Sequence, residues 1–254
     1  MKNKTKVAIT LGAVGAGVAA WAASKAIVKR TPRDTKALFQ NDKLPIAVRS
    51  QLNTLQSDEQ FATTVYVTQD EQLVATTIPV TEPLPLGEIK YRTAEQLTAD
   101  YPQFILLDEL HERLNDRILF IMIGDEPSSF EGSLIPSKLW EFIEKTDRCD
   151  SVIIASEYEE QLDRFNLYAQ NEVVLVATED EVKKAYAAYS SALGHLYQPN
   201  ADIAIIRLKD NLLRAHQQRF IHFLNQLNVQ VMIEVDDQEV ETTPSIIGTI
   251  SFHH

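Results

Sequence analysis

The sequence has a single cysteine, Cys149, so it forms no intrachain disulfide and holds no metal cluster built from several cysteines. Its few glycines include no glycine-rich phosphate-binding loop. No serine–histidine–aspartate or cysteine–histidine arrangement stands out either. The sequence therefore offers none of the common motifs for nucleotide binding or nucleophilic catalysis.

Basic residues are scarce after the first 36 positions. Those positions hold eight Lys or Arg residues against one acid, Asp34, whereas residues 37–254 hold 16 basic and 35 acidic residues, a net charge of −19. Because nucleic-acid phosphates are bound by clustered Lys and Arg, so acidic a body predicts no nucleic-acid partner. The acidity is most simply a solubility feature.

A long apolar run lies near the N-terminus. Residues 7–28 would form a helix about 33 Å long, close to the bilayer core of about 30 Å. We expect residues 1–30 to be an uncleaved membrane anchor that contacts the lipid bilayer through residues 7–28. A cleaved signal peptide is the alternative, because three lysines precede the run and Ala20-Trp21-Ala22 resembles a cleavage site.

The side of the membrane on which the rest of the chain lies stays open. Five Lys or Arg residues between positions 25 and 36, against three lysines before the run, favour a cytoplasmic domain, whereas a signal anchor gives the opposite side. Residues 31–43 are polar and contain Pro32, so they predict a linker. One domain is expected over residues 44–254.

In this domain, segments typical of strands alternate with segments typical of helices. Capping boxes at Ser156–Glu159 and Thr178–Glu181 indicate helix starts, and apolar residues recur at helical spacing over 134–145 and 212–227. The alternation predicts a parallel sheet, and eight strands predict a closed (β/α)8 TIM-type barrel, with an open doubly wound sheet as the alternative. The predicted strands are Ile46–Arg49, Thr63–Thr68 with a hairpin partner at Leu73–Thr77, Ile118–Gly124, Ser151–Ser156, Val173–Thr178, Ile203–Leu208, Val229–Val235 and Ile246–Phe252.

Several strings, in this order, resemble the glycerophosphodiester phosphodiesterase family of TIM barrels from about Leu44 onward. LPIAVRS at 44–50 lies where the family has an apolar strand ending in His-Arg-Gly, and LNTL at 52–55 is similar to its Glu-Asn-Thr-Leu. ATTVYVT at 62–68 matches its Glu-Leu-Asp-Val strand. Residues 118–124 match its Ile-Glu-Ile-Lys strand, with Gly124 in place of the lysine.

The resemblance implies phosphodiester hydrolysis with a divalent cation, Ca or Mg, held by carboxylates, and with histidines that move protons. At the matching positions this chain has side chains that neither bind a metal strongly nor act as general acids near neutral pH. These positions are Val48, Ala62, Thr64, Thr77 and Met122. We therefore expect no catalytic residue, no metal and no cofactor.

Acidic residues follow several of the predicted strands. They support an alternative, a divergent metal-dependent phosphoric diester hydrolase of lipid metabolism whose metal site has moved to Asp125, Glu126, Asp236 and Asp237. Acids in the first turns of helices also satisfy free N–H groups and the helix dipole. This simpler explanation is the one we prefer.

The expected function is that of a membrane-tethered, catalytically inactive barrel that binds a ligand or a protein. Arg49, Glu157 and Glu234 are the candidate ligand-binding residues. Arg49 would grip a phosphate or a carboxylate, or else pair with a neighbouring acid such as Glu234. The partner is expected to be an unidentified phosphorylated small molecule or a protein, and a pure scaffold is a third possibility.

Overall fold

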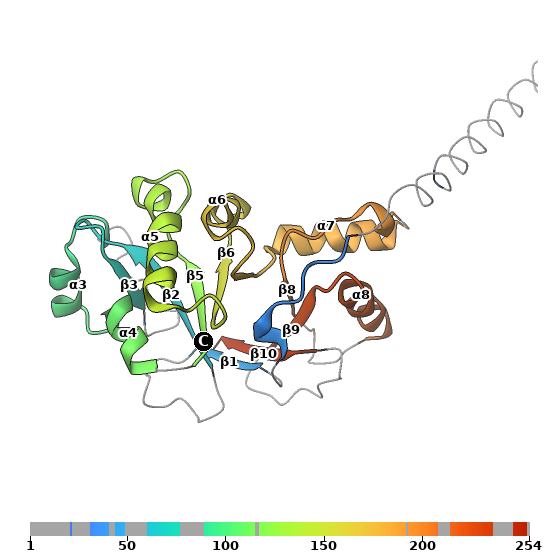
Figure 1. The fold of residues 1–254 in the computed structure, drawn as a ribbon, viewed down its shortest axis with the longest axis horizontal. Coiled ribbons are helices and arrows are strands. Elements are labelled where there is room, and N and C mark those ends of the chain that lie inside the picture. Colours follow the sequence, from blue (N-terminus) through green and yellow to red (C-terminus); the bar gives the residue numbers. More distant parts are fainter. Residues whose placement is uncertain are drawn as a thin grey trace, which may run out of the picture.

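The computed structural model describes Trp21 and residues 31–40, 44–48, 60–76, 89–114, 117–191, 193–207, 214–235 and 246–252. Eight parallel strands follow one another around a barrel, β7-β6-β5-β2-β1-β10-β9-β8 (Figure 1). A parallel bridge between Val176 and Ile203 joins the two ends of this row. The predicted TIM-type barrel is thus confirmed over the open sheet. The strands are β1 (Leu44–Val48), β2 (Gln60–Val67), β5 (Leu119–Ile123), β6 (Val152–Ser156), β7 (Val174–Leu175), β8 (Ile203–Arg207), β9 (Gln230–Val235) and β10 (Gly248–Phe252).

Two further strands extend the sheet beside β2. Strand β3 (Leu73–Thr76) pairs antiparallel with β2, as the predicted hairpin requires, and β4 (Phe104–Leu106) pairs antiparallel with β3. The Thr68 hydroxyl donates a hydrogen bond to Asp70 Oδ1 at 2.6 Å, and Glu71 has a positive φ of 58°. A side-chain hydrogen bond and one left-handed residue are what a tight turn between two strands needs.

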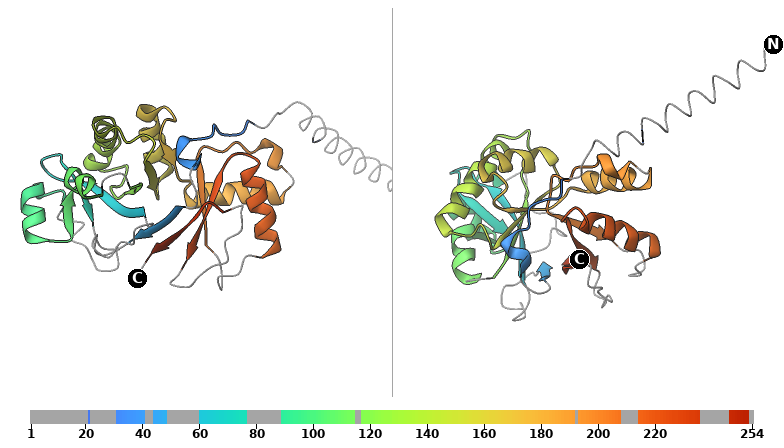
Figure 2. Two further views of the ribbon diagram at one scale, coloured as in Figure 1. Left: turned by 60° about the horizontal axis from the view of Figure 1, so that its bottom comes forward. Right: turned by 45° about the vertical axis from the view of Figure 1, so that its right-hand side comes forward.

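Helices cover the outside of the barrel, as two further views show (Figure 2). Helix α5 contains the periodic stretch 134–145, and α8 lies within 212–227, so both predicted helices are confirmed. The described helices are α3 (Ala94–Asp100), α4 (Leu107–Leu114), α5 (Phe130–Thr146), α6 (Glu159–Ala169), α7 (Glu179–Ser190) and α8 (Ala215–Asn225), with 3-10 helices η1 (Ala37–Gln40) and η3 (Gly194–Leu196).

Of the two predicted capping boxes, only that at Thr178 provides a helix N-cap, and the side chain of its Glu181 bonds to Tyr197 instead. Thr178 is the N-cap of α7, and its hydroxyl accepts a hydrogen bond from the Glu181 amide at 3.2 Å. Ser156 caps no helix, because its hydroxyl accepts from the Tyr158 amide at 3.1 Å and α6 begins only after Tyr158. Serine hydroxyls compete for nearby amides in this way, so the same sequence pattern gives a local turn here.

The core has an inner and an outer layer. The inner layer holds residues from every barrel strand whose side chains are described: Ala62, Phe120, Ile153, Ala155, Val174, Ile203, Met232 and Ile250. The outer layer lies between the strands and the helices, where Phe61, Ile121 and Ile154 meet α5 and α6 side chains such as Leu139 and Phe165. Alternation along each strand separates the two layers.

Residues that the sequence indicates as a linker pack against the barrel. Leu38 in η1 is 2% exposed and belongs to the inner layer. Arg33 donates through Nε to Asp202 Oδ1 at 2.9 Å, and its amide donates to the Leu227 carbonyl. The apolar side chain of Leu38 and the buried charge of Asp202 account for this packing of residues 31–40.

Within the part of the chain that the structure describes, no helix is long and apolar enough to cross a membrane. Of the apolar run 7–28, only Trp21 is described. The anchor expected there stays a prediction.

Candidate ligand site at the barrel mouth

The positions matched to the family's metal-binding acids lie side by side on the inner face of the barrel. Ala62 and Met122 pack in the inner layer, and Thr64 shares their face because strand side chains alternate. Thr64 is the direct neighbour of Met122 in the pairing of β2 with β5. Val48 ends β1, and Thr77 lies outside the described residues. The described part of this constellation carries no carboxylate.

A tyrosine ring covers the position matched to the family's lysine. Gly124 follows β5, and a Cβ added to it would lie 2.2 Å from Cε1 of Tyr66. Only a residue without a side chain leaves room for this ring. Burial, together with the nearby charges of Asp125 and Glu157, raises the pKa of Tyr66 to about 12. The phenol is therefore neutral at physiological pH.

Asp125 lies shortly after β5, at the mouth of the barrel, which is the end where the parallel strands terminate. Its Oδ2 accepts a hydrogen bond from the Val67 amide at 2.8 Å, which ties the end of β5 to the end of β2. Burial raises its pKa to about 6, while the bond from Val67 opposes the rise and the charge of Glu131 adds to it. The fully buried Gln161 side chain donates to the Asp125 carbonyl at 2.9 Å. These contacts give Asp125 a structural role and leave a carboxyl that titrates near neutral pH.

The other acids proposed for a relocated metal site do not gather around Asp125. Glu126 and Glu157 are both exposed. Among the described residues, no group of three or more His, Cys, Asp or Glu side chains is placed to hold a metal ion. Asp236 and Asp237 lie outside the described residues, as does Arg49.

Glu234, a candidate ligand residue, is paired with an arginine that the sequence analysis did not single out. Arg207 and Glu234 are neighbours where β8 pairs with β9, and Nη2 of Arg207 lies 2.5 Å from Oε1 of Glu234. The glutamate side chain is 14% exposed, whereas that of the arginine is 76% exposed. Strand alternation gives Arg207 the same face as Ile203 and Ile205, which is the signal that would have found it.

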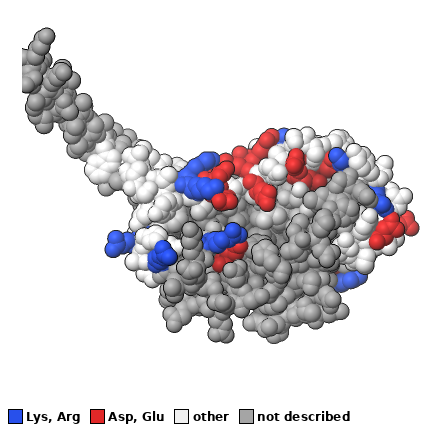
Figure 3. Space-filling model, turned by 180° about the vertical axis from the view of Figure 1, so that it is seen from behind, with Lys and Arg blue, Asp and Glu red and all other residues white. Residues whose placement is uncertain are grey.

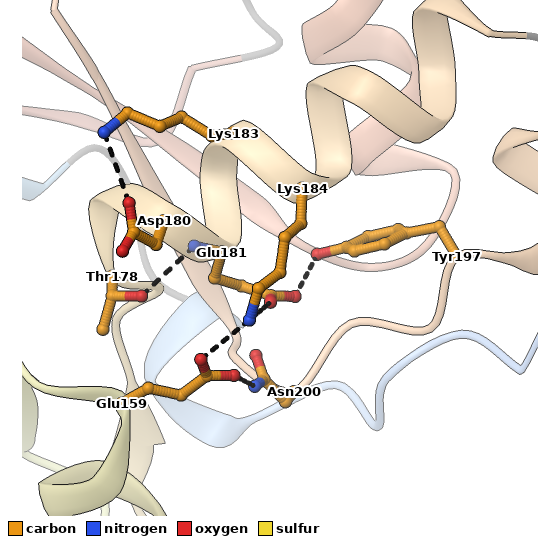
Figure 4. Close-up of polar contacts among 8 residues, drawn as sticks. All are labelled: Glu159, Thr178, Asp180, Glu181, Lys183, Lys184, Tyr197 and Asn200. Atoms are coloured by element: carbon orange, nitrogen blue, oxygen red, sulfur yellow. Dashed lines mark hydrogen bonds and ion pairs between the residues drawn. The ribbon is translucent and has the colours of Figure 1, made fainter.

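A second polar cluster lies where α7 begins (Figure 4). The buried Glu181 accepts a hydrogen bond from the Tyr197 hydroxyl at 2.7 Å and lies 3.9 Å from the Lys184 ammonium. Lys184 also contacts Glu159 at 2.7 Å. Burial and the hydrogen bond to Glu181 raise the pKa of Tyr197. These partners account for the buried carboxylate.

A small cavity of about 100 Å³ adjoins this cluster. Its lining includes one base, Arg33, and two acids, Asp163 and Glu181, so it carries charges of both signs. On the face shown in Figure 3, acidic and basic side chains likewise lie next to each other at several points. The described residues that line the cavity therefore give it no excess positive charge that would select an anion.

Comparisons with known proteins support the fold and go no further. No protein-family model matches the sequence, and no curated protein matches it. Solved structures with the same fold include a glycerophosphoryl diester phosphodiesterase from Parabacteroides distasonis, with a TM-score of 0.55 and 14% identity over 87% of this chain and 90% of that one. One from Agrobacterium tumefaciens has a TM-score of 0.55 and 12% identity, over 82% and 96% of the two chains.

The phosphodiesterase domain of a Mycobacterium tuberculosis protein also has a TM-score of 0.55, with 13% identity over 83% of this chain and 96% of that one. The chain is therefore an α/β barrel, and its fold is of the glycerophosphodiester phosphodiesterase kind. This agrees with the likeness seen in its sequence. At such low identity the likeness concerns the fold alone.

Proposed function

We propose that this protein is a membrane-tethered barrel of the glycerophosphodiester phosphodiesterase fold that does not hydrolyse phosphodiesters and acts by binding a ligand or a protein. The observation that supports the proposal most is the inner face at Ala62, Thr64 and Met122, where apolar and hydroxyl side chains take the places of the family's metal-binding acids. Divalent cations need several oxygen ligands, and of these three side chains only that of Thr64 carries an oxygen. The packing of the Tyr66 ring against Gly124 supports the proposal further, because the ring fills the space that the family's lysine side chain would take.

The test is an assay of the full chain with glycerophosphodiesters in the presence of Mg²⁺ or Ca²⁺. We expect no release of glycerol 3-phosphate above a blank without protein. Chelator-sensitive release would contradict the proposal. The matched control is a variant with Ala62→Glu, Thr64→Asp and Met122→Glu, which restores acids at the three positions and changes nothing else. Any weak activity of the unchanged chain is compared with the activity of this variant.

Binding is the second half of the proposal, and the mouth supplies its candidate residues. Arg49 is the residue proposed to grip an anion, and Arg207 is the described arginine at the mouth, paired with Glu234. Thermal-shift measurements with glycerol 3-phosphate and with inorganic phosphate should show stabilisation that Arg49→Ala removes. If neither compound shifts the melting temperature, a protein partner or a scaffold role is favoured over a phosphorylated ligand.

A metal-dependent hydrolase with a relocated site is the second candidate function. The position of Asp125 favours it: the carboxyl is held at the ends of β2 and β5 by the Val67 amide, and burial raises its pKa to about 6, which suits a general acid. Such an enzyme would lose activity in Asp125→Asn and keep it in Asp150→Asn. Its rate would also change with pH around the pKa of Asp125.

A further inference from the structure

Large apolar side chains are exposed on α7 and on the segment that follows it. Tyr186 on α7 is 43% exposed, and Leu193 and Leu196, which flank the buried His195, are 42% and 50% exposed. The backbone beneath them is firmly packed, since a Cβ added to Gly194 would lie 2.8 Å from the Phe223 ring. Clustered exposed apolar side chains on a well-packed base are typical of an interaction surface.

Trp21, the described residue of the apolar run 7–28, contacts the barrel at this same surface. Trp21 belongs to the run 7–28, is 38% exposed, and lies edge-on to the His195 ring with 6.3 Å between the ring centroids. The first described residues after the run, from Thr31, lie beside the far end of α7 (Figure 1). We call Trp21, Tyr186, Leu193 and Leu196 the apolar tip.

Helix α8, which packs beside the apolar tip, has an unusual charge. The Phe220 ring of α8 contacts Tyr186 edge-on at 5.2 Å between centroids, and Phe223 lies against Gly194. Among the described α-helices, α8 alone contains no Asp or Glu, and it carries Arg219 and two histidines after the N-cap Arg214. In a chain with a net charge of −12, an acid-free helix beside exposed apolar side chains is a local exception.

We infer that the apolar tip and α8 together lie on an anionic lipid bilayer, an inference that rests on the membrane tether proposed above. Trp, Tyr and Leu side chains enter the interfacial region of a bilayer, while arginines bind its anionic headgroups. A second copy of the chain is a poorer occupant, because a symmetric contact would bring the two basic α8 helices together.

The inference fixes which end of the barrel meets the membrane. Helix η3 precedes β8 in the chain, so the apolar tip lies at the end where the parallel strands begin. Arg207 at the mouth ends the same strand, β8, so the mouth lies at the other end of that strand. A ligand at the mouth would therefore arrive from the aqueous phase and not from the bilayer beneath the protein.

The test measures the distance of two labelled sites from the bilayer. The full chain with Cys149→Ser carries one environment-sensitive fluorophore, attached through Leu196→Cys at the apolar tip or through Phe130→Cys as the matched control. Phe130 is 67% exposed and starts α5, the helix that follows β5 in the chain. Vesicles of phosphatidylcholine with or without phosphatidylglycerol are used, and some carry brominated acyl chains that quench the fluorophore at short range.

We expect the label at position 196 to shift its emission to the blue and to be quenched by brominated lipid, and the label at position 130 to do neither. Quenching at 196 should be stronger with phosphatidylglycerol present, and Arg219→Glu should reduce it severalfold. Circular dichroism checks the fold of each variant, and Leu193→Cys replaces Leu196→Cys if the latter does not fold.

Three results would overturn the inference, and they differ in what else they contradict. If the protein floats with the vesicles but the labels at 196 and 130 behave alike, the tether stands and the docked face does not. If the full chain does not float with any vesicle, the tether fails as well. If the label at 196 becomes shielded without lipid as protein concentration rises, the occupant is a second copy.

Discussion

We expect the ion pair between Arg33 and Asp202 to contribute strongly to the stability of the fold. Asp202 is fully buried, and besides Arg33 it accepts a hydrogen bond from the Leu175 amide at 3.0 Å, where β7 and β8 close the barrel. Arg33→Met keeps the length of the side chain but leaves a buried carboxylate without its counter-charge. Breaking a buried pair from one side costs about 3–5 kcal/mol, and the 15% exposure of the arginine side chain favours the lower end, about 3 kcal/mol.

The decrease in the free energy of unfolding caused by Arg33→Met is measured by urea denaturation of the full chain. A decrease of about 3 kcal/mol corresponds to a melting temperature lower by about 6–12 °C for a chain of this size. Arg113→Met is the matched control, because Arg113 and Glu109 form an exposed pair at 3.8 Å that contributes at most about 1 kcal/mol. Adding Asp202→Asn to Arg33→Met should recover part of the loss. If Arg33→Met costs no more than Arg113→Met, residues 31–40 are not part of the folded barrel.

Three further changes test the mouth and the caps. Gly124→Ala should destabilise the fold by about 1–3 kcal/mol in urea denaturation, because its methyl group meets the Tyr66 ring, and Tyr66→Ala in the same chain should make that substitution nearly neutral. Folding raises the pKa of Asp125 to about 6, so the native state binds this proton more tightly than the unfolded state does. The free energy of unfolding should therefore fall as pH rises from about 4 to about 6, and Asp125→Asn should flatten this dependence. An unchanged slope in Asp125→Asn would contradict the raised pKa. Thr178→Ala removes an N-cap and should cost about 0.5–2 kcal/mol, more than Ser156→Ala, whose hydroxyl caps no helix.

Much of the architecture follows from local patterns in the chain. Strand-like segments such as 118–124 and 151–156 alternate with helical ones, and eight of them in a chain of this length leave the closed barrel as the expected solution. The absence of the family's metal-binding acids from their matching positions also follows from the sequence. Once the strands are aligned with the family, Ala62, Thr64 and Met122 are seen at those positions. The local pattern does not fix the hydrogen bonding, because the same four-residue pattern serves a turn at Ser156 and a helix cap at Thr178.

The contacts between distant segments were decided by tertiary structure alone. Arg33 meets Asp202 across 169 positions, Glu234 pairs with Arg207, and the Tyr66 ring covers Gly124. The last two contacts depend on the register of neighbouring strands, because a shift of one residue would turn the side chains to the other face. The first depends on how residues 31–40 pack against the closed barrel. The chain itself thus determined the barrel and the loss of the family's metal ligands, whereas the closure of the barrel settled which charges are paired and which end carries the apolar tip.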